Sequence, residues 1–180
     1  MAYDFKNIKV LLVEKSPHVL ALLEDVLTIL TIPRKNISSA TTTEEGFKKF
    51  CEENHDLVIV DWIEDPTSGI QLTHKIRAEK GSPNNYVPVL MTAGSGHENK
   101  VIKARDMGVS GYLVKPFQAK ELAQKIEAII EKPRPFIVHS SFIGPDRRIS
   151  KKPYTGKERR HTPPVVANST DNIKKKLTQK

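Results

Sequence analysis

The segment Asp56-Leu-Val-Ile-Val-Asp61 decides the fold of this chain. Its four central residues are all apolar and three of them are β-branched. Such a run is too short for a helix and is typical of a parallel strand that is buried on both faces. Because open α/β sheets bind their ligands beyond the carboxyl ends of the strands, Asp61 is the first candidate functional residue.

The alternation of an apolar run with a helical pattern occurs five times before residue 132. The predicted strands are 9–13, 36–40, 56–61, 87–91 and 111–114, and the predicted helices begin near residues 17, 42, 69, 97 and 118. Ser16 before Pro17, and Thr42 three residues before Glu45, are typical helix starts. Five strands alternating with five helices predict a parallel α/β sheet with right-handed crossovers and helices on both faces.

The net charge of +8 is distributed unevenly along the chain. Residues 1–132 hold 17 Lys and Arg against 18 Asp and Glu, whereas residues 133–180 hold 12 against 3. Pro133 and Pro135 end the periodic pattern, so we expect a domain at 6–132 and a mostly disordered basic extension at 133–180. Its charge predicts an anionic partner such as a nucleotide, a nucleic acid or a membrane surface.

Two further features of the sequence concern its apolar segments. No apolar stretch is long enough to cross a bilayer and the N-terminus lacks a signal-peptide core, which predicts a soluble cytoplasmic protein. The extension contains two short apolar runs, Phe136-Ile-Val138 and Phe142-Ile143. Because exposed apolar runs are costly, docking of these runs on the sheet domain is favoured over docking on a partner.

Charged and polar residues follow four of the predicted strands at one edge of the sheet. They are Glu14, Lys15, Asp61, Thr92 and Lys115. With their neighbours in Val13-Glu-Lys-Ser-Pro17, Asp61-Trp62, Thr92-Ala93 and Tyr112-Leu-Val-Lys-Pro-Phe117, they make residues 6–132 resemble the receiver domain of bacterial response regulators, including CheY. The resemblance implies a flavodoxin-like (βα)5 fold with strand order 2-1-3-4-5.

The resemblance also implies roles for these residues. Asp61 would accept a phosphoryl group from a histidine kinase, Thr92 and Lys115 would bind phosphoryl oxygens, and Mg²⁺ would be held by Glu14 and Asp61. Tyr112 would be the aromatic switch residue, and the Lys115-Pro116 bond would be cis. A signalling protein rather than an enzyme is implied.

Lys15 departs from the receiver pattern. The acidic pair expected after the first strand reads Glu14-Lys15, so an ammonium stands where a second Mg²⁺ ligand is expected. At about 4 Å from Asp61 and an effective dielectric near 20, its attraction to that carboxylate would be roughly 4 kcal/mol before desolvation. This favours a pseudo-receiver that is phosphorylated poorly or not at all. The alternative, with Lys15 in solvent and Mg²⁺ still bound, stays open.

A short repeat occurs in the extension. Gly144-Pro-Asp-Arg-Arg148 is followed twelve residues on by Gly156-Lys-Glu-Arg-Arg160, with Tyr154 between the copies. Arginine can donate paired hydrogen bonds to guanine or bind phosphate, a carboxylate can accept from the opposite guanine edge, and tyrosine can stack. Two half-motifs match cyclic di-GMP, which has two guanines and two phosphates. The predicted nucleotide ligands are Asp146, Arg147, Arg148, Tyr154, Gly156, Glu158, Arg159 and Arg160.

The whole chain resembles the Cle group of CheY-like proteins. That resemblance implies that nucleotide binding orders the extension, that the complex engages the flagellar motor switch near Ile102, Tyr112 and Lys120, and that the protein is recruited to the flagellar pole. One alternative is a phosphorylated single-domain regulator with an inert tail. Another is a nucleic-acid or anionic-membrane binder, whose affinity would track charge and fall steeply with salt; it is the less expected of the two.

Overall fold

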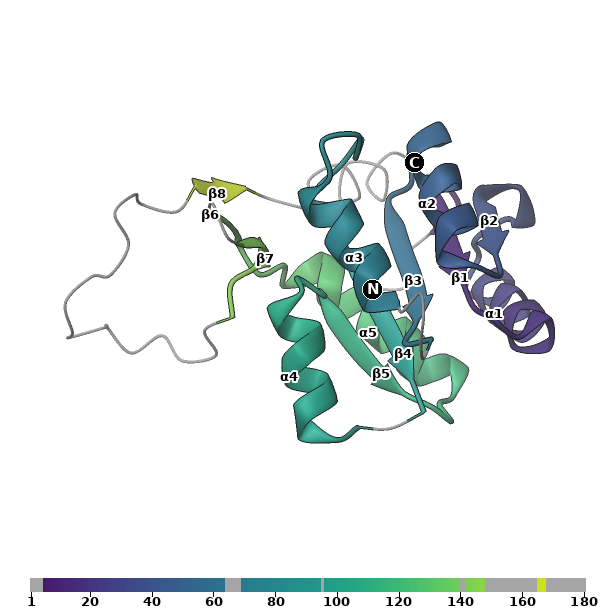
Figure 1. The fold of residues 1–180 in the computed structure, drawn as a ribbon. Coiled ribbons are helices and arrows are strands. Elements are labelled where there is room, and N and C mark those ends of the chain that lie inside the picture. Colours follow the sequence, from purple (N-terminus) through teal and green to yellow (C-terminus); the bar gives the residue numbers. More distant parts are fainter. Residues whose placement is uncertain (1–4, 64–68, 95, 140–141, 148–164, 168–180) are drawn as a thin grey trace.

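The computed structural model describes residues 5–63, 69–94, 96–139, 142–147 and 165–167. Its main sheet has five parallel strands in the order β2-β1-β3-β4-β5 (Figure 1). These strands are β1 (Val10–Val13), β2 (Ile37–Ala40), β3 (Leu57–Asp61), β4 (Val89–Ala93) and β5 (Gly111–Val114). The helices are α1 (Pro17–Ile29), α2 (Thr43–Glu52), α3 (Gly69–Ala78), α4 (Glu98–Asp106) and α5 (Ala119–Glu131), with a 3-10 turn at Arg34–Asn36. The predicted fold class and strand order are confirmed.

The helices divide into two layers because the apolar residues of each strand alternate between the two faces. Val10 and Leu12 pack with α1 and α5 on one face, whereas Leu11 and Val13 pack with α2, α3 and α4 on the other. Apolar side chains of β3 occur in both clusters, as the unbroken run at 57–60 predicts. This arrangement brings the carboxyl ends of all five strands to one edge.

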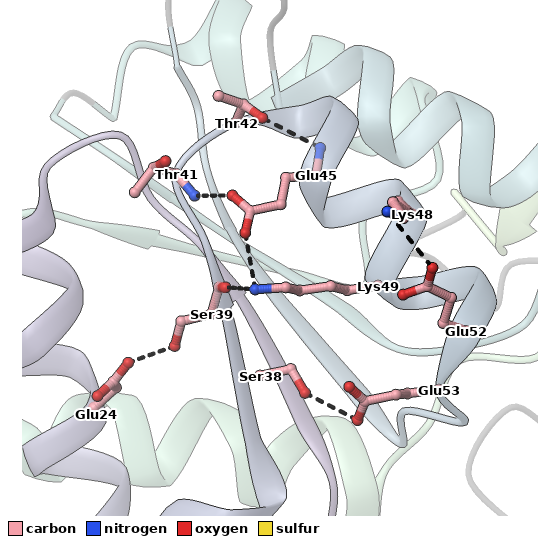
Figure 2. A network of polar contacts seen from close by, with 10 residues as sticks. All are labelled: Glu24, Ser38, Ser39, Thr41, Thr42, Glu45, Lys48, Lys49, Glu52 and Glu53. Atoms are coloured by element: carbon pink, nitrogen blue, oxygen red, sulfur yellow. Dashed lines mark hydrogen bonds and ion pairs between the residues drawn. The ribbon is translucent and has the colours of Figure 1, made fainter.

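Polar side chains surround the edge strand β2 (Figure 2). Ser38 and Ser39 donate hydrogen bonds to Glu53 and Glu24, respectively. Lys49 donates to the backbone carbonyl of Ser39 at 2.5 Å and pairs with Glu45 at 2.8 Å. Charged side chains that occupy a sheet edge discourage pairing with another chain, so this network makes β2 a protected edge.

The start of α2 has the capping residue that the sequence predicts. The Thr42 hydroxyl accepts from the Glu45 N–H at 3.2 Å. The reciprocal bond differs from a capping box, because the Glu45 carboxylate accepts from the N–H of Thr41 rather than of Thr42. Ser16 likewise caps α1 by accepting from the N–H of Val19.

The extension contributes a second, antiparallel sheet in the order β7-β6-β8. Its strands are β6 (Phe136–His139), β7 (Phe142–Pro145) and β8 (Val165–Ala167). Regular structure here was not predicted, because the polar composition of the whole extension hides a local apolar hairpin. Phe136 is only 1% exposed, which agrees with the predicted docking of this run on the sheet domain. Residues 148–164 and 168–180 lie outside the described residues.

No helix in the described ranges is long and apolar enough to cross a membrane.

His55 makes the stability of the fold depend on pH. Its side chain is buried against the Phe50 ring, with centroids 6.2 Å apart. Burial lowers the pKa of His55 below its ordinary 6.5, and the nearby Glu53 carboxylate only partly opposes this. Because the unfolded chain then binds more protons, we expect the free energy of unfolding to fall as the pH drops below about 6.5.

Urea unfolding of the wild type and of His55→Leu at about pH 7.5 and about pH 5 would measure this effect. The variant should lose less stability than the wild type between the two pH values. An equal loss in both proteins would show that other groups are responsible.

Candidate functional site

Four residues expected at the edge of the sheet meet in one pocket. Asp61 ends β3, and its neighbour in the register of β4 is Thr92. The Lys115 ammonium lies 2.8 Å from Asp61 and 2.5 Å from Glu14. The Thr92 hydroxyl lies 3.3 Å from the same oxygen of Asp61. The bond between Lys115 and Pro116 is cis, as the sequence suggested.

Lys115 is the cation that contacts both carboxylates of the pocket. Burial alone would lower the pKa of Lys115, but hydrogen bonds to Asp61 and Glu14 outweigh it and raise the pKa above its ordinary value. The other oxygen of Glu14 accepts the N–H of Ser16 at 3.0 Å. Glu14, which is only 4% exposed, is therefore held by an ammonium and a backbone donor.

Lys15 lies outside this pocket. Its side chain is exposed, and no ion pair of Lys15 occurs within the described ranges. The pairing of Lys15 with Asp61 considered from the sequence is therefore not found, because Lys115 already occupies that position. Glu14 continues the buried strand β1, and its neighbour Lys15 is left on the surface.

The donor set of the pocket fits Mg²⁺ poorly. Mg²⁺ prefers six oxygen ligands in near-octahedral geometry, among them one or two carboxylates and several waters. Here Glu14 and Asp61 share one ammonium, and the described part of the chain contains no group of three or more His, Cys, Asp or Glu side chains that could hold a metal ion. A divalent cation would have to displace the Lys115 ammonium from Glu14 and Asp61. The second acid that would help to bind the cation is missing, because Lys15 stands in its position.

Replacement of Lys115 would measure how much its ammonium contributes to the stability of the fold. Lys115→Met leaves Glu14 and Asp61 facing each other, so we expect a loss of about 2 kcal/mol in the free energy of unfolding at neutral pH. Lys120→Met on the exposed side of α5 is the matched control for chemical denaturation. Equal stability of both variants would contradict a structural role for the Lys115 ammonium.

Comparison with known proteins identifies the family of this domain. Residues 10–127 match the response regulator receiver domain family. The chain belongs to this family. The match ends before the extension, so the function of the extension has to be inferred from its own residues.

Several relatives of this receiver are chemotaxis proteins. Chemotaxis protein CheY-3 of Vibrio cholerae is 30% identical over 127 residues, which is 71% of this chain and 95% of that protein. Chemotaxis protein CheY of Pseudomonas aeruginosa is 38% identical over 79 residues, 44% of this chain and 62% of that protein. The solved structure of Vibrio cholerae CheY4 superposes with a TM-score of 0.61 at 21% identity, covering 68% of this chain and 98% of that one. This last likeness shows a shared fold.

The receiver has a groove between α4, β5 and α5. Its volume is about 660 Å³, and its wall includes Val101, Ile102 and Tyr112. Burial raises the pKa of the Tyr112 hydroxyl, with Lys100 opposing and Asp61 adding to the shift. Ile102 and Tyr112 thus lie together on the face predicted to bind a partner, whereas Lys120 is exposed on α5 and does not line the groove.

Only the beginning of the predicted nucleotide site lies in the described residues. Asp146 and Arg147 follow β7 directly. The Arg147 guanidinium lies 4.3 Å from the centre of the Phe142 ring and 3.4 Å from Asp106, the last residue of α4. The predicted ligands Arg148, Tyr154, Gly156, Glu158, Arg159 and Arg160 lie outside the described residues.

Proposed function

We propose that this receiver is a signalling adaptor of the Cle type: it binds cyclic di-GMP through its arginine-rich extension and then engages the flagellar motor switch. The observation that supports this most is the position of Arg147 on a docked hairpin beside α4. The first half-motif therefore begins on an ordered part of the chain, which lowers the entropy that a ligand must offset.

Arg147 has the chemistry of a nucleotide ligand. Its side chain is 47% exposed, and within the described residues it makes one hydrogen bond, to Asp106. A guanidinium has five donors, so most of its donors remain for a guanine edge or a phosphate. The Phe142 ring supports the guanidinium plane from one side, which favours a fixed orientation. The backbone of the preceding Asp146 is held by a bond from its N–H to the carbonyl of Pro135 at 2.8 Å.

The residues around Asp61 support nucleotide binding, rather than phosphorylation, as the main input signal. One ammonium already contacts both carboxylates, and Lys15 stands where a second acid is expected. A receiver of this kind binds Mg²⁺ weakly and accepts a phosphoryl group slowly, so a nucleotide sensor in the extension supplies the input that the pocket has lost.

The groove between α4, β5 and α5 is the proposed binding surface for the motor switch. Val101 and Ile102 are each 37% exposed and lie beside cationic residues, among them Arg105 and Lys125. An amphipathic segment with acidic residues would complement such a wall. The relatives are named chemotaxis proteins, and the resemblance to the Cle group implies the flagellar motor switch as the protein that provides this segment.

A second function is favoured by a specific observation. Asp61, Thr92 and Lys115 lie together, with distances of 2.8 and 3.3 Å to one oxygen of Asp61, and the resemblance to receivers implies that these residues accept and bind a phosphoryl group. With Lys15 in solvent, this arrangement supports a single-domain response regulator that receives phosphate from a histidine kinase. The two functions differ in their input, and phosphorylation measurements separate them.

Calorimetric titration of the full chain with cyclic di-GMP tests the proposed function. Cyclic di-AMP is the matched control because it carries the same ring and charges but lacks the guanine O6 and N1–H groups. We expect cyclic di-GMP to bind at least about tenfold more tightly, since one paired contact to guanine contributes about 1–3 kcal/mol of discrimination. Equal affinities that fall together with salt would support a charge-driven anion binder instead.

A further inference from the structure

Arg77 of α3 is a buried cation. It is only 2% exposed, and no carboxylate of the described chain lies within ion-pairing distance. Its guanidinium instead donates to backbone carbonyls, twice to Gly108 at 3.0 and 3.1 Å and once to Asn85 at 2.9 Å. The Asn85 amide donates back to the carbonyl of Arg77 at 2.8 Å. Arg77 therefore ties the C-terminal end of α4 to α3.

The extension completes the burial of Arg77. The guanidinium carbon lies 4.9 Å from the centre of the Phe136 ring in β6. Phe136 in turn packs edge-on against Tyr86, with ring centroids 5.7 Å apart. Burial lowers the pKa of Arg77 to about 9. Phe136 covers the guanidinium, and without this ring water would compete for the donors that bind Gly108.

Two glycines bring the hairpin backbone against the end of α4. Gly108 has φ +89°, and a Cβ there would lie 2.8 Å from the carbonyl oxygen of Ile143. A Cβ on Gly144 of β7 would lie 2.7 Å from the Cα of Gly108. Gly144 is also the first residue of the repeated motif. Close packing on Gly108 thus explains the glycine in this copy without a ligand.

We infer that the β6–β7 hairpin is a latch that fixes the C-terminal end of α4. Arg77 donates hydrogen bonds to Gly108, Phe136 of the hairpin packs on the Arg77 guanidinium, and Gly144 packs on the backbone of Gly108. β7 also lies against α3 (Figure 1). Because α4 forms one wall of the groove through Val101 and Ile102, release of the hairpin frees that wall.

The latch also gives a route from the first half-motif to the groove. Arg147 lies two residues beyond β7 and contacts Asp106 at the end of α4. A ligand that takes Arg147 from Asp106 would change how the hairpin and α4 meet. This last step rests on the proposed function, whereas the latch itself does not.

Hydrogen exchange of the backbone amides in the full chain tests the latch. Two variants loosen it at different contacts, Gly144→Ala at the backbone approach and Phe136→Ala at the guanidinium. Gly81→Ala is the matched control, because a Cβ at Gly81 meets nothing within 4 Å. We expect exchange in 104–110 to become at least about tenfold faster in both loosened variants, with α1 and β1 unchanged and the control equal to wild type.

Two results would overturn the latch. Unchanged exchange in 104–110 of both variants would show that these contacts do not hold α4. Equally faster exchange in α1 and β1 would show that the hairpin is a general stabiliser. Cyclic di-GMP added to the wild type tests the route to the groove: altered exchange in α4 supports it, and binding with α4 unchanged overturns it. Absence of binding would refute the proposed function, while the variants still decide the latch.

Discussion

Replacing Arg147 and Arg159 together by alanine should weaken binding of cyclic di-GMP by at least about a hundredfold. Each of these residues is the first arginine of one half-motif, so the double change removes one charged donor fork from each copy. A hydrogen bond to a charged group contributes about 1.5–3 kcal/mol, and two such losses give the expected factor. Calorimetric titration at a fixed salt concentration measures the affinity.

The control removes the same charge from the same extension. Lys151→Ala with Lys152→Ala also takes away two cations, but lysine lacks the planar fork that matches a guanine edge. We expect this variant to lose only a few-fold in affinity through its weaker electrostatic attraction. Equal losses in both variants would mean that the extension binds anions by charge alone, and unchanged affinity in the arginine variant would refute the assigned ligands.

Lys15→Asp should increase the rate of phosphorylation of Asp61 by a small phosphodonor with Mg²⁺ by about tenfold to a hundredfold. The change removes an ammonium next to Glu14 and adds the carboxylate that the pocket lacks. A third oxygen ligand lets Mg²⁺ compete with the Lys115 ammonium for Glu14 and Asp61. Mass spectrometry of the intact protein over time gives the labelled fraction.

Lys15→Met separates the two effects of this change. It removes the positive charge without adding a ligand, so its rate should stay near that of the wild type. Rapid, stoichiometric labelling of the wild type, at the rate of Lys15→Asp, would show that the pocket needs no second acid. In that case the chain would act as a phosphorylated response regulator, and the extension would not be its main input.

Local patterns were sufficient to predict the receiver fold. The run at 57–60 is apolar at every position, which only a strand covered on both faces explains, and it became β3 at the centre of the sheet. The fourth strand was predicted at 87–91 but is observed at Val89–Ala93. Pro88 has no N–H to donate and contributes only its carbonyl, which accepts from Val58 at 3.0 Å, so the paired residues begin at Val89. Thr92 is consequently part of β4 rather than beyond it.

Local sequence patterns could not predict the contacts between segments that are far apart in the chain. Arg77 reads as an ordinary basic residue near a helix end, and only the fold brings it to Gly108 and Phe136. Likewise, the sequence suggested a pairing of Lys15 with Asp61 and gave Lys115 as a ligand of a phosphoryl oxygen, whereas in the structure Lys115 contacts Asp61 because β5 ends there. The apolar runs of the extension were recognised, but their pairing into β6 and β7 depends on contacts with the receiver.

The most direct test replaces residues 146–160 by a glycine-serine linker of the same length and titrates the product with cyclic di-GMP. This design keeps Phe136 over Arg77 and retains β6, β7 and β8, whereas truncation at Pro133 would uncover Arg77. We expect binding to be lost while amide exchange in α1 and β1, away from the Arg147–Asp106 contact, stays as in the wild type. Undiminished binding by the linker protein would contradict the assignment of nucleotide capture to the arginine motifs.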